Sequence, residues 1–154
     1  MKLAVKRLRQ SDLSFFEPIY RRSNSSKQKA LNLNRSVLTG QLYPDLEESG
    51  REKALPIRLH IWGPDAADEL TLSRSITKEQ KNWRLNGELV REPEDGRFSS
   101  IEPDDIAVIR FDGVGLPETV TLVIISAAAP ADAAIHPALR ELAGNSMSAV
   151  SPEG

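Results

Sequence analysis

Apolar and polar side chains alternate along several short segments of this 154-residue chain. The alternation is clearest in IRLHIW (57–62), ELTLSRSI (69–76), DIAVIRF (105–111) and TVTLVIIS (119–126). Because successive side chains of a strand point to opposite faces of a sheet, this period of two predicts strands that are buried on one face. Residues 3–8 and the segment ALNLN (30–34) show a shorter form of the same pattern.

Turn-forming residues separate the predicted strands. GPDAAD (63–68) joins two of them as a hairpin, and the glycine-rich DGVGLPE (112–118) separates two others. Asn86-Gly87 lies between apolar flanks in WRLNGELV (83–90), which is the strongest short-range hairpin signal in the chain. The spacing of these turns favours an antiparallel barrel or sandwich over a doubly wound sheet.

Three segments predict short helices. Residues 11–20 allow one or two turns before Pro18, and residues 36–44 predict a helix that is capped by Ser36 and stops before Pro44. Residues 130–143 predict a short helix that is interrupted near Pro137. With six or seven strands, the chain is expected to form one mainly β domain over residues 1–143, followed by a flexible tail or linker at 144–154.

Composition narrows the classes of function. The chain has no cysteine, and its two histidines, His60 and His136, are too few for most zinc enzymes. Both histidines fit structural or exposed positions better than metal-binding ones. The N-terminal MKLAVKRLRQ lacks the apolar run of a signal peptide, and no stretch approaches the roughly 20 apolar residues of a membrane helix. We therefore expect a soluble, cytoplasmic protein without a cofactor.

The formal net charge of −2 hides a strong asymmetry. Residues 1–35 contain nine lysines and arginines against two acids, and residues 74–91 contain five against two. The rest of the chain therefore carries a net charge of −12. Two basic segments on an acidic body predict a surface that binds a polyanion.

The residue types in these two segments suit DNA. Lysine and arginine neutralise phosphates, asparagine and glutamine pair with the edge of adenine, and arginine pairs with guanine. The candidates in the first segment are Arg21, Arg22, Lys27, Gln28, Lys29, Asn32, Asn34 and Arg35. Those in the second are Lys78, Lys81, Asn82, Trp83, Arg84 and Asn86. The alternative is that both segments are solvated edges and that Trp83 belongs to the core.

A second alternative is a metal-dependent nuclease. Pro64-Asp65 followed by Glu79-Gln80-Lys81 matches the PD…ExK spacing, in which two carboxylates hold Mg²⁺ and a lysine positions the attacking water. The match is poor in context, because Asp65 lies in a predicted turn and the polar SITK, not an apolar run, precedes Glu79. The sequence therefore favours binding over catalysis.

The order of these features resembles that of the plant transcription-factor pseudobarrel DNA-binding domains of the B-three type. RLRQSDLSFF (7–16) and LNRSVLTGQLYP (33–44) carry the resemblance through Leu8, Ser11 and Asp12, then Asn34-Arg35, then Tyr43-Pro44. IEPDDIAVIRF (101–111) is similar to the apolar-x-x-Gly-Asp-apolar element that leads into a late strand of that family, with Asp104 in place of glycine. The layout also resembles the N-terminal effector-DNA-binding domain of EcoRII, which implies a pseudobarrel of about seven strands and two basic DNA-gripping arms.

The sequence thus predicts a sequence-preferring module for double-stranded DNA in a restriction or defence system. Such a module would be cytoplasmic, prokaryotic and nucleoid-associated, and it would not be an enzyme by itself. A nuclease domain or subunit would be its partner. A protein-interaction domain and a reader of RNA or modified DNA remain alternatives.

Overall fold

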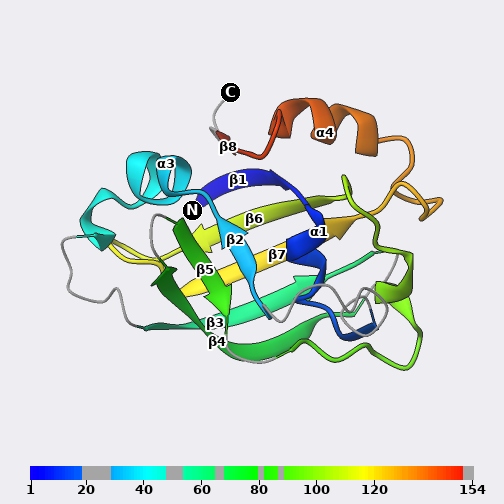
Figure 1. The fold of residues 1–154 in the computed structure, drawn as a ribbon, viewed down its shortest axis with the longest axis horizontal. Coiled ribbons are helices and arrows are strands. Elements are labelled where there is room, and N and C mark those ends of the chain that lie inside the picture. The colour runs from blue at the N-terminus through cyan, green and yellow to red at the C-terminus, as the bar shows by residue number, and fades with distance from the viewer. Residues whose placement is uncertain (19–28, 48–53, 65–67, 80–81, 87–88, 151–154) are drawn as a thin grey trace.

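A computed structural model of the chain describes residues 1–18, 29–47, 54–64, 68–79, 82–86 and 89–150. Within these residues, eight strands form one sheet in the order β2-β5-β4-β3-β7-β6-β1-β8 (Figure 1). The strands are β1 (Lys2–Arg7), β2 (Leu31–Leu33), β3 (Leu55–Trp62), β4 (Leu70–Glu79), β5 (Asn82–Asn86), β6 (Ile106–Asp112), β7 (Thr119–Ile125) and β8 (Met147–Val150). Neighbouring strands are antiparallel except for β3 and β7, which are parallel.

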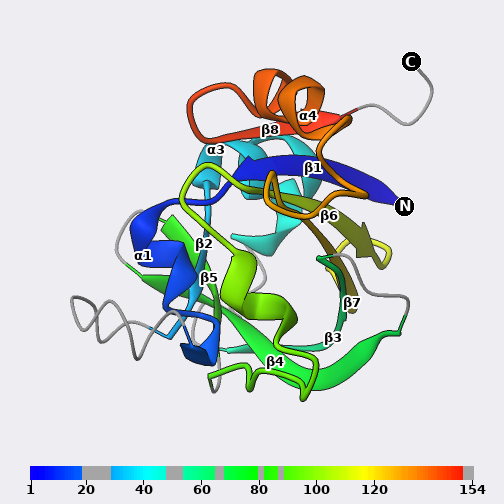
Figure 2. The same ribbon diagram turned by 90° about the vertical axis from the view of Figure 1, so that its right-hand side faces the viewer.

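The sheet curls into an open barrel, seen along its length in Figure 2. The two edge strands meet near one point, where Asn34, directly after β2, exchanges hydrogen bonds with Ser146, directly before β8. The Asn34 amide nitrogen donates to the Ser146 hydroxyl at 3.0 Å, and that hydroxyl lies 3.2 Å from the Asn34 carbonyl oxygen. The expectation of a mainly β, barrel-like fold with short helices is confirmed.

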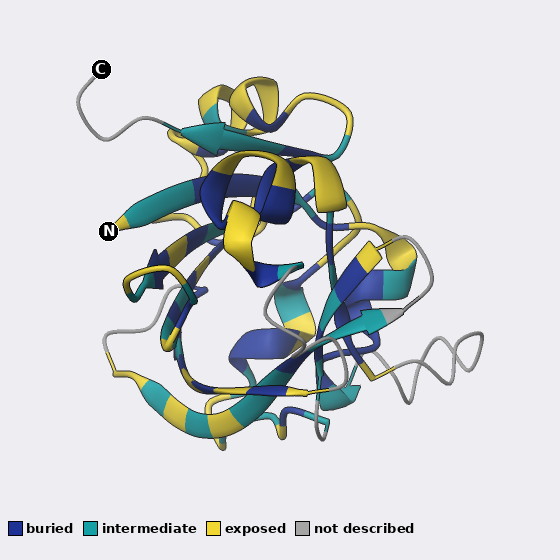
Figure 3. Ribbon diagram, turned by 90° about the vertical axis from the view of Figure 1, so that its left-hand side faces the viewer, coloured by how far each residue is buried: buried dark blue, intermediate teal, exposed yellow. Residues whose placement is uncertain are grey.

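Alternation along the strands builds the core. On β3 the residues Leu55, Ile57, Leu59 and Ile61 are buried and alternate with exposed or half-buried neighbours, as the sequence pattern predicts. Figure 3 shows buried and exposed residues alternating in the same way along the wall of the barrel. Burial of this continuous apolar interior is the main stabilising contribution to the fold.

Short helices plug and cover the barrel. They are α1 (Gln10–Leu13), α3 (Arg35–Val37), the π-helix η1 (Leu38–Leu42), the 3-10 helices η2 (Pro44–Leu46) and η3 (Arg97–Ser100), and α4 (His136–Ala143). The N-cap of the helical segment after β2 lies two residues earlier than predicted, at Asn34 instead of Ser36. Pro137 occupies the first turn of α4 and does not interrupt it, since a proline there removes no hydrogen bond of the helix.

Two sequence predictions about strands are wrong. Residues 144–150 are not part of a flexible tail, because Met147–Val150 pair with β1 and the Met147 side chain is buried. The turn predicted at Asn86-Gly87 reaches into residues outside those described, but the described strands leave no edge of β5 for the predicted hairpin. Strand β5 pairs with β4 and β2, while Val90 bridges to Phe16, so tertiary pairing outweighs the local turn signal.

Candidate nucleic-acid interface

The two basic segments of the sequence meet on neighbouring strands. Strand β2 from the first segment pairs antiparallel with β5 from the second, and this register sets Asn32 opposite Arg84. On its other side β5 pairs with β4, with Thr77 opposite Arg84 and Ser75 opposite Asn86. Residues some fifty positions apart in the chain therefore share one surface.

Alternation decides which side chains reach this surface. On β5 the apolar Trp83 and Leu85 point into the barrel, so Asn82, Arg84 and Asn86 point outward. The same rule exposes Asn32 between the buried Leu31 and Leu33. We call the outward residues of these three strands the polar face: Asn32, Ser75, Thr77, Asn82, Arg84 and Asn86. It combines amides, hydroxyls and a guanidinium.

Several of its side chains are held in place by hydrogen bonds. The Asn86 amide nitrogen donates to the Thr77 hydroxyl at 2.5 Å, across the β4–β5 pair. The Asn32 amide nitrogen lies 3.4 Å from the Ser11 hydroxyl, and the Asn82 side-chain oxygen lies 3.4 Å from the backbone nitrogen of Arg35. The face is therefore partly preorganised, which lowers the entropy that binding would cost.

A buried carboxylate supports the first segment from below. Asp12 accepts the backbone N–H of Asn32 and that of Arg9, both at 2.9 Å. The oxygen that accepts the Arg9 N–H also lies 3.3 Å from the ammonium of Lys6, and both side chains are almost completely buried. One carboxylate thus ties β1, α1 and β2 together, which gives the Ser11-Asp12 element of the sequence a structural role.

At the end of the β4–β5 pair, a single carboxylate lies between cations of both segments. One of these cations, Lys78, pairs with the inward-pointing Trp83 and so lies on the side of β4 opposite to the polar face. Glu47, in the turn after η2, accepts hydrogen bonds from Nε and Nη2 of Arg35, and its Oε1 lies 3.9 Å from the Lys78 ammonium. The Thr39 hydroxyl lies 3.0 Å from the same oxygen. The hydrogen bonds from Arg35, above all, lower the pKa of Glu47 to about 2, with smaller contributions from Thr39 and Lys78. Sequence patterns gave no signal for Glu47, because its partners are distant in the chain.

The structure removes one candidate from the interface and reassigns another. The Trp83 side chain is fully buried, so it belongs to the core and cannot contact DNA in this conformation. The ammonium of Lys78 lies 5.9 Å from the centre of its ring. The Asn34 amide is engaged in hydrogen bonds with Ser146, next to the other edge strand of the sheet.

The remaining candidates divide into two groups. Lys29 is exposed two residues before β2, and Arg35 follows Asn34 as the first residue of α3. Five candidates lie outside the described residues: Arg21, Arg22, Lys27, Gln28 and Lys81. Their place in the interface remains a prediction.

The two described residues of the nuclease motif, Pro64 and Glu79, lie apart. Pro64 follows β3 at the end where β4 begins, whereas Glu79 is the last residue of β4. A ten-residue strand spans roughly 30 Å, so the backbone positions of Pro64 and Glu79 lie at opposite ends of the hairpin. Asp65 and Lys81 lie outside the described residues. In the part of the chain that is described, no group of three acidic or histidine side chains could hold a metal ion.

The two histidines have carboxylate partners. His60 Nδ1 lies 2.7 Å from Glu69 on the outer side of the β3–β4 hairpin. His136 Nε2 lies 3.1 Å from Asp105, and both of these side chains are buried. Each histidine therefore has a structural partner, in line with the roles that the sequence favours.

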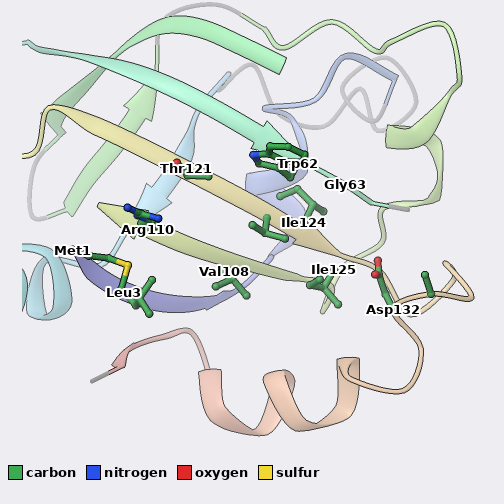
Figure 4. A pocket seen from close by; sticks show the side chains of 12 residues that line it. Met1, Leu3, Trp62, Gly63, Val108, Arg110, Thr121, Ile124, Ile125 and Asp132 are labelled. Atoms are coloured by element: carbon green, nitrogen blue, oxygen red, sulfur yellow. The ribbon is translucent and has the colours of Figure 1, made fainter. Parts of the chain in front are cut away.

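A groove of about 900 Å³ lies on the outer side of β1, β6 and β7 (Figure 4). Its lining is mainly apolar and includes Leu3, Trp62 and Val108. Polar side chains are a minority of this lining. It does not suit a phosphate backbone.

Comparison with known proteins adds evidence on the fold. No family model matches the chain, and no curated protein sequence matches it. Among solved structures, the chain is similar to the N-terminal domain of Helicobacter pylori LlaJI.R1, with a TM-score of 0.57 and 12% sequence identity over 98% of both chains. At this identity the likeness concerns the fold. Over the described residues, no helix is both long and apolar enough to cross a membrane.

Proposed function

We propose that this chain is a double-stranded DNA-binding domain of a restriction or defence system, with a preference for particular sequences. The observation that carries the proposal is that strands from the two basic segments pair with each other, which sets Asn32 opposite Arg84 on one surface. The fold likeness to the N-terminal domain of a restriction-system protein supports it. The sequence resemblance to EcoRII and the B-three domains points the same way.

The residue types suggest a division of labour. Lys29 and Lys78 would contact phosphates, together with Arg21, Arg22, Lys27 and Lys81, which lie outside the described residues. Asn32, Asn82, Arg84 and Asn86 of the polar face, with Arg35 at its end, would contact base edges. Asn34 and Trp83 are excluded from this set because one closes the barrel and the other fills the core. Catalysis would belong to a separate nuclease domain or subunit.

Selection from a random duplex library at low salt, with sequencing of the bound pool, tests the proposal. We expect retention of DNA and enrichment of a short motif. Retention without enrichment would mean that only phosphates are bound. No retention would contradict the proposal and favour a protein-interaction domain, while preferential retention of RNA or of modified duplexes would favour a reader of those molecules.

Two further measurements separate phosphate binding and catalysis from base reading. Affinity should fall steeply with salt, and the double substitution Lys29→Ala and Lys81→Ala should flatten this dependence, since each phosphate contact releases a counterion. An unchanged slope would contradict the two-segment interface. Plasmid incubated with Mg²⁺ should stay intact. Cleavage that Asp65→Ala or Glu79→Ala abolishes would establish the nuclease alternative instead.

A further inference from the structure

Arg35 lies at the junction of the two basic segments. It begins α3 directly after β2, and its backbone nitrogen lies 3.4 Å from the side-chain oxygen of Asn82 on β5. Its side chain is 51% exposed, so a ligand that approaches from solvent can reach the guanidinium. Through its backbone, Arg35 adjoins the polar face at Asn82.

The guanidinium is held along one edge. Nε and Nη2 donate side by side to the two oxygens of Glu47, the Nη2 bond being 2.9 Å long. Glu47 is itself held by Thr39, whose hydroxyl lies 3.0 Å from Glu47 and 3.1 Å from the backbone oxygen of Arg35. This two-point contact fixes the plane of the guanidinium, which a single hydrogen bond would leave free to rotate.

The geometry leaves the other edge of the guanidinium available. An arginine has five N–H groups, of which Glu47 takes one from Nε and one from Nη2. The remaining three include the pair at the tip, one on each Nη. No other side-chain partner of Arg35 is found within the described residues. Two parallel N–H groups at the tip match the O6 and N7 acceptors of guanine in the major groove.

The negative charge of Glu47 suits a role in orienting the Arg35 guanidinium better than a role in attracting DNA phosphates. A carboxylate between Arg35 and Lys78 removes positive charge from a surface that is proposed to meet phosphates, which weakens non-specific attraction to DNA. It also holds the rigid fork of the arginine in one orientation, which favours two simultaneous hydrogen bonds to a base. An arginine that served only as a phosphate contact would gain nothing from such a neighbour.

We propose that Arg35 reads a guanine and that Glu47 is the positioning residue that sets its orientation. The inference rests on the proposed function, because it requires that the polar face bind duplex DNA. It adds Glu47, an acidic residue outside both basic segments, to the determinants of sequence preference.

The test uses the DNA site selected by the wild-type protein. Dissociation constants are measured for that site and for every single-base-pair change in it, with wild type, Arg35→Ala, Glu47→Ala, Glu47→Gln and Asp112→Asn. The last variant is a matched control, because Asp112 holds Arg110 in a similar exposed pair on β6, away from the polar face. Thermal melting of each variant verifies that it is folded.

We expect one guanine position to be preferred roughly 5- to 100-fold by the wild type, the range that a bidentate contact supports. Arg35→Ala and Glu47→Ala should both abolish the preference at that same position. The double variant Arg35→Ala with Glu47→Ala should lose no more of this preference than Arg35→Ala alone. Glu47→Gln keeps one acceptor oxygen and should retain part of the preference. Asp112→Asn should retain all of it. If Glu47→Ala does not fold, the base preference of Glu47→Gln at that position tests the inference instead.

Two results would overturn the inference. Glu47 substitutions that change affinity equally for all sequences would show that its charge alone matters, and a uniform loss in Arg35→Ala would make Arg35 a phosphate contact. DNA that is bound without any base preference would also overturn this inference while leaving DNA binding in place. Failure of the wild type to bind any duplex would instead contradict the proposed function itself.

Discussion

Asn32 on β2 and Arg84 on β5 lie directly opposite each other, although they are 52 positions apart in the sequence. Residues paired in this way are close enough to act on one ligand together. The pairing turns two separate basic stretches of sequence into one surface. That surface is continued by Thr77 on β4, opposite Arg84 on its other side.

The buried pair of Lys6 and Asp12 is predicted to be essential for stability. Asp12→Ala would leave the Lys6 ammonium buried without its partner and would remove the acceptor for the N–H groups of Asn32 and Arg9. We expect a loss of about 3–5 kcal/mol in the free energy of unfolding, measured by urea denaturation.

The companion variants test the cause of this loss. Lys6→Met should cost less, because Asp12 keeps its two backbone donors. The double variant should be more stable than the sum of the single losses predicts, since the two residues are coupled. Strictly additive losses would contradict a direct pair.

At position 104, substitution by glycine is predicted to destabilise the protein less than substitution by alanine. Its φ of +77° lies in the left-handed region, at the position where the B-three resemblance has glycine. Both substitutions remove the 2.6 Å ion pair with Arg7, so they differ mainly in backbone strain. We expect Asp104→Gly to be about 1 kcal/mol more stable than Asp104→Ala in urea denaturation. Equal stability would show that the backbone relaxes at this position.

Alternation was sufficient to predict the central strands β3, β4, β6 and β7, because each buries one face in the core. It could not predict β8, whose small residues form a strand only because the edge of β1 is available to pair with them. The adjacency of β2 and β5 is likewise a tertiary property. Local turn chemistry at Asn86-Gly87 pointed to a different partner for β5.

The candidate site was predictable in outline only. Charge segregation and the amide-rich composition indicated which strands would carry it, and alternation correctly turned Asn32 and Arg84 outward. The same alternation buries Trp83. Its aromatic ring is therefore part of the core, although its residue type would suit a DNA contact. Glu47 could not be found, since it approaches Arg35 and Lys78 only through the fold.

The ion pair of Glu47 is predicted to make stability depend on pH in acid. The hydrogen bonds from Arg35 lower the pKa of Glu47 from 4.5 to about 2 in the folded protein. Its contribution is therefore fully present above about pH 4.5 and is lost as the pH falls through about 2, below which the carboxylate is protonated in both states. The difference in unfolding free energy between wild type and Glu47→Gln should shrink over this window.

Comparing wild type with Glu47→Gln isolates the contribution of the Glu47 carboxylate. Asp95 and Asp104 also have lowered pKa values because of Arg97 and Arg7, respectively, and they are present in both proteins. Their contributions cancel in the difference. A difference that stays constant from about pH 6 to about pH 2 would show that the pair does not contribute to stability.

The most direct test of the polar face compares two arginines of equal charge on different sides of the barrel. Arg84 lies on the polar face, and Arg110 is exposed on the outer side of β6. Affinity for the selected duplex is measured for Arg84→Ala and Arg110→Ala under identical salt conditions. We expect Arg84→Ala to weaken binding roughly tenfold or more and Arg110→Ala to leave it nearly unchanged. Equal losses in the two variants, or a greater loss in Arg110→Ala, would contradict the assignment of DNA binding to this face.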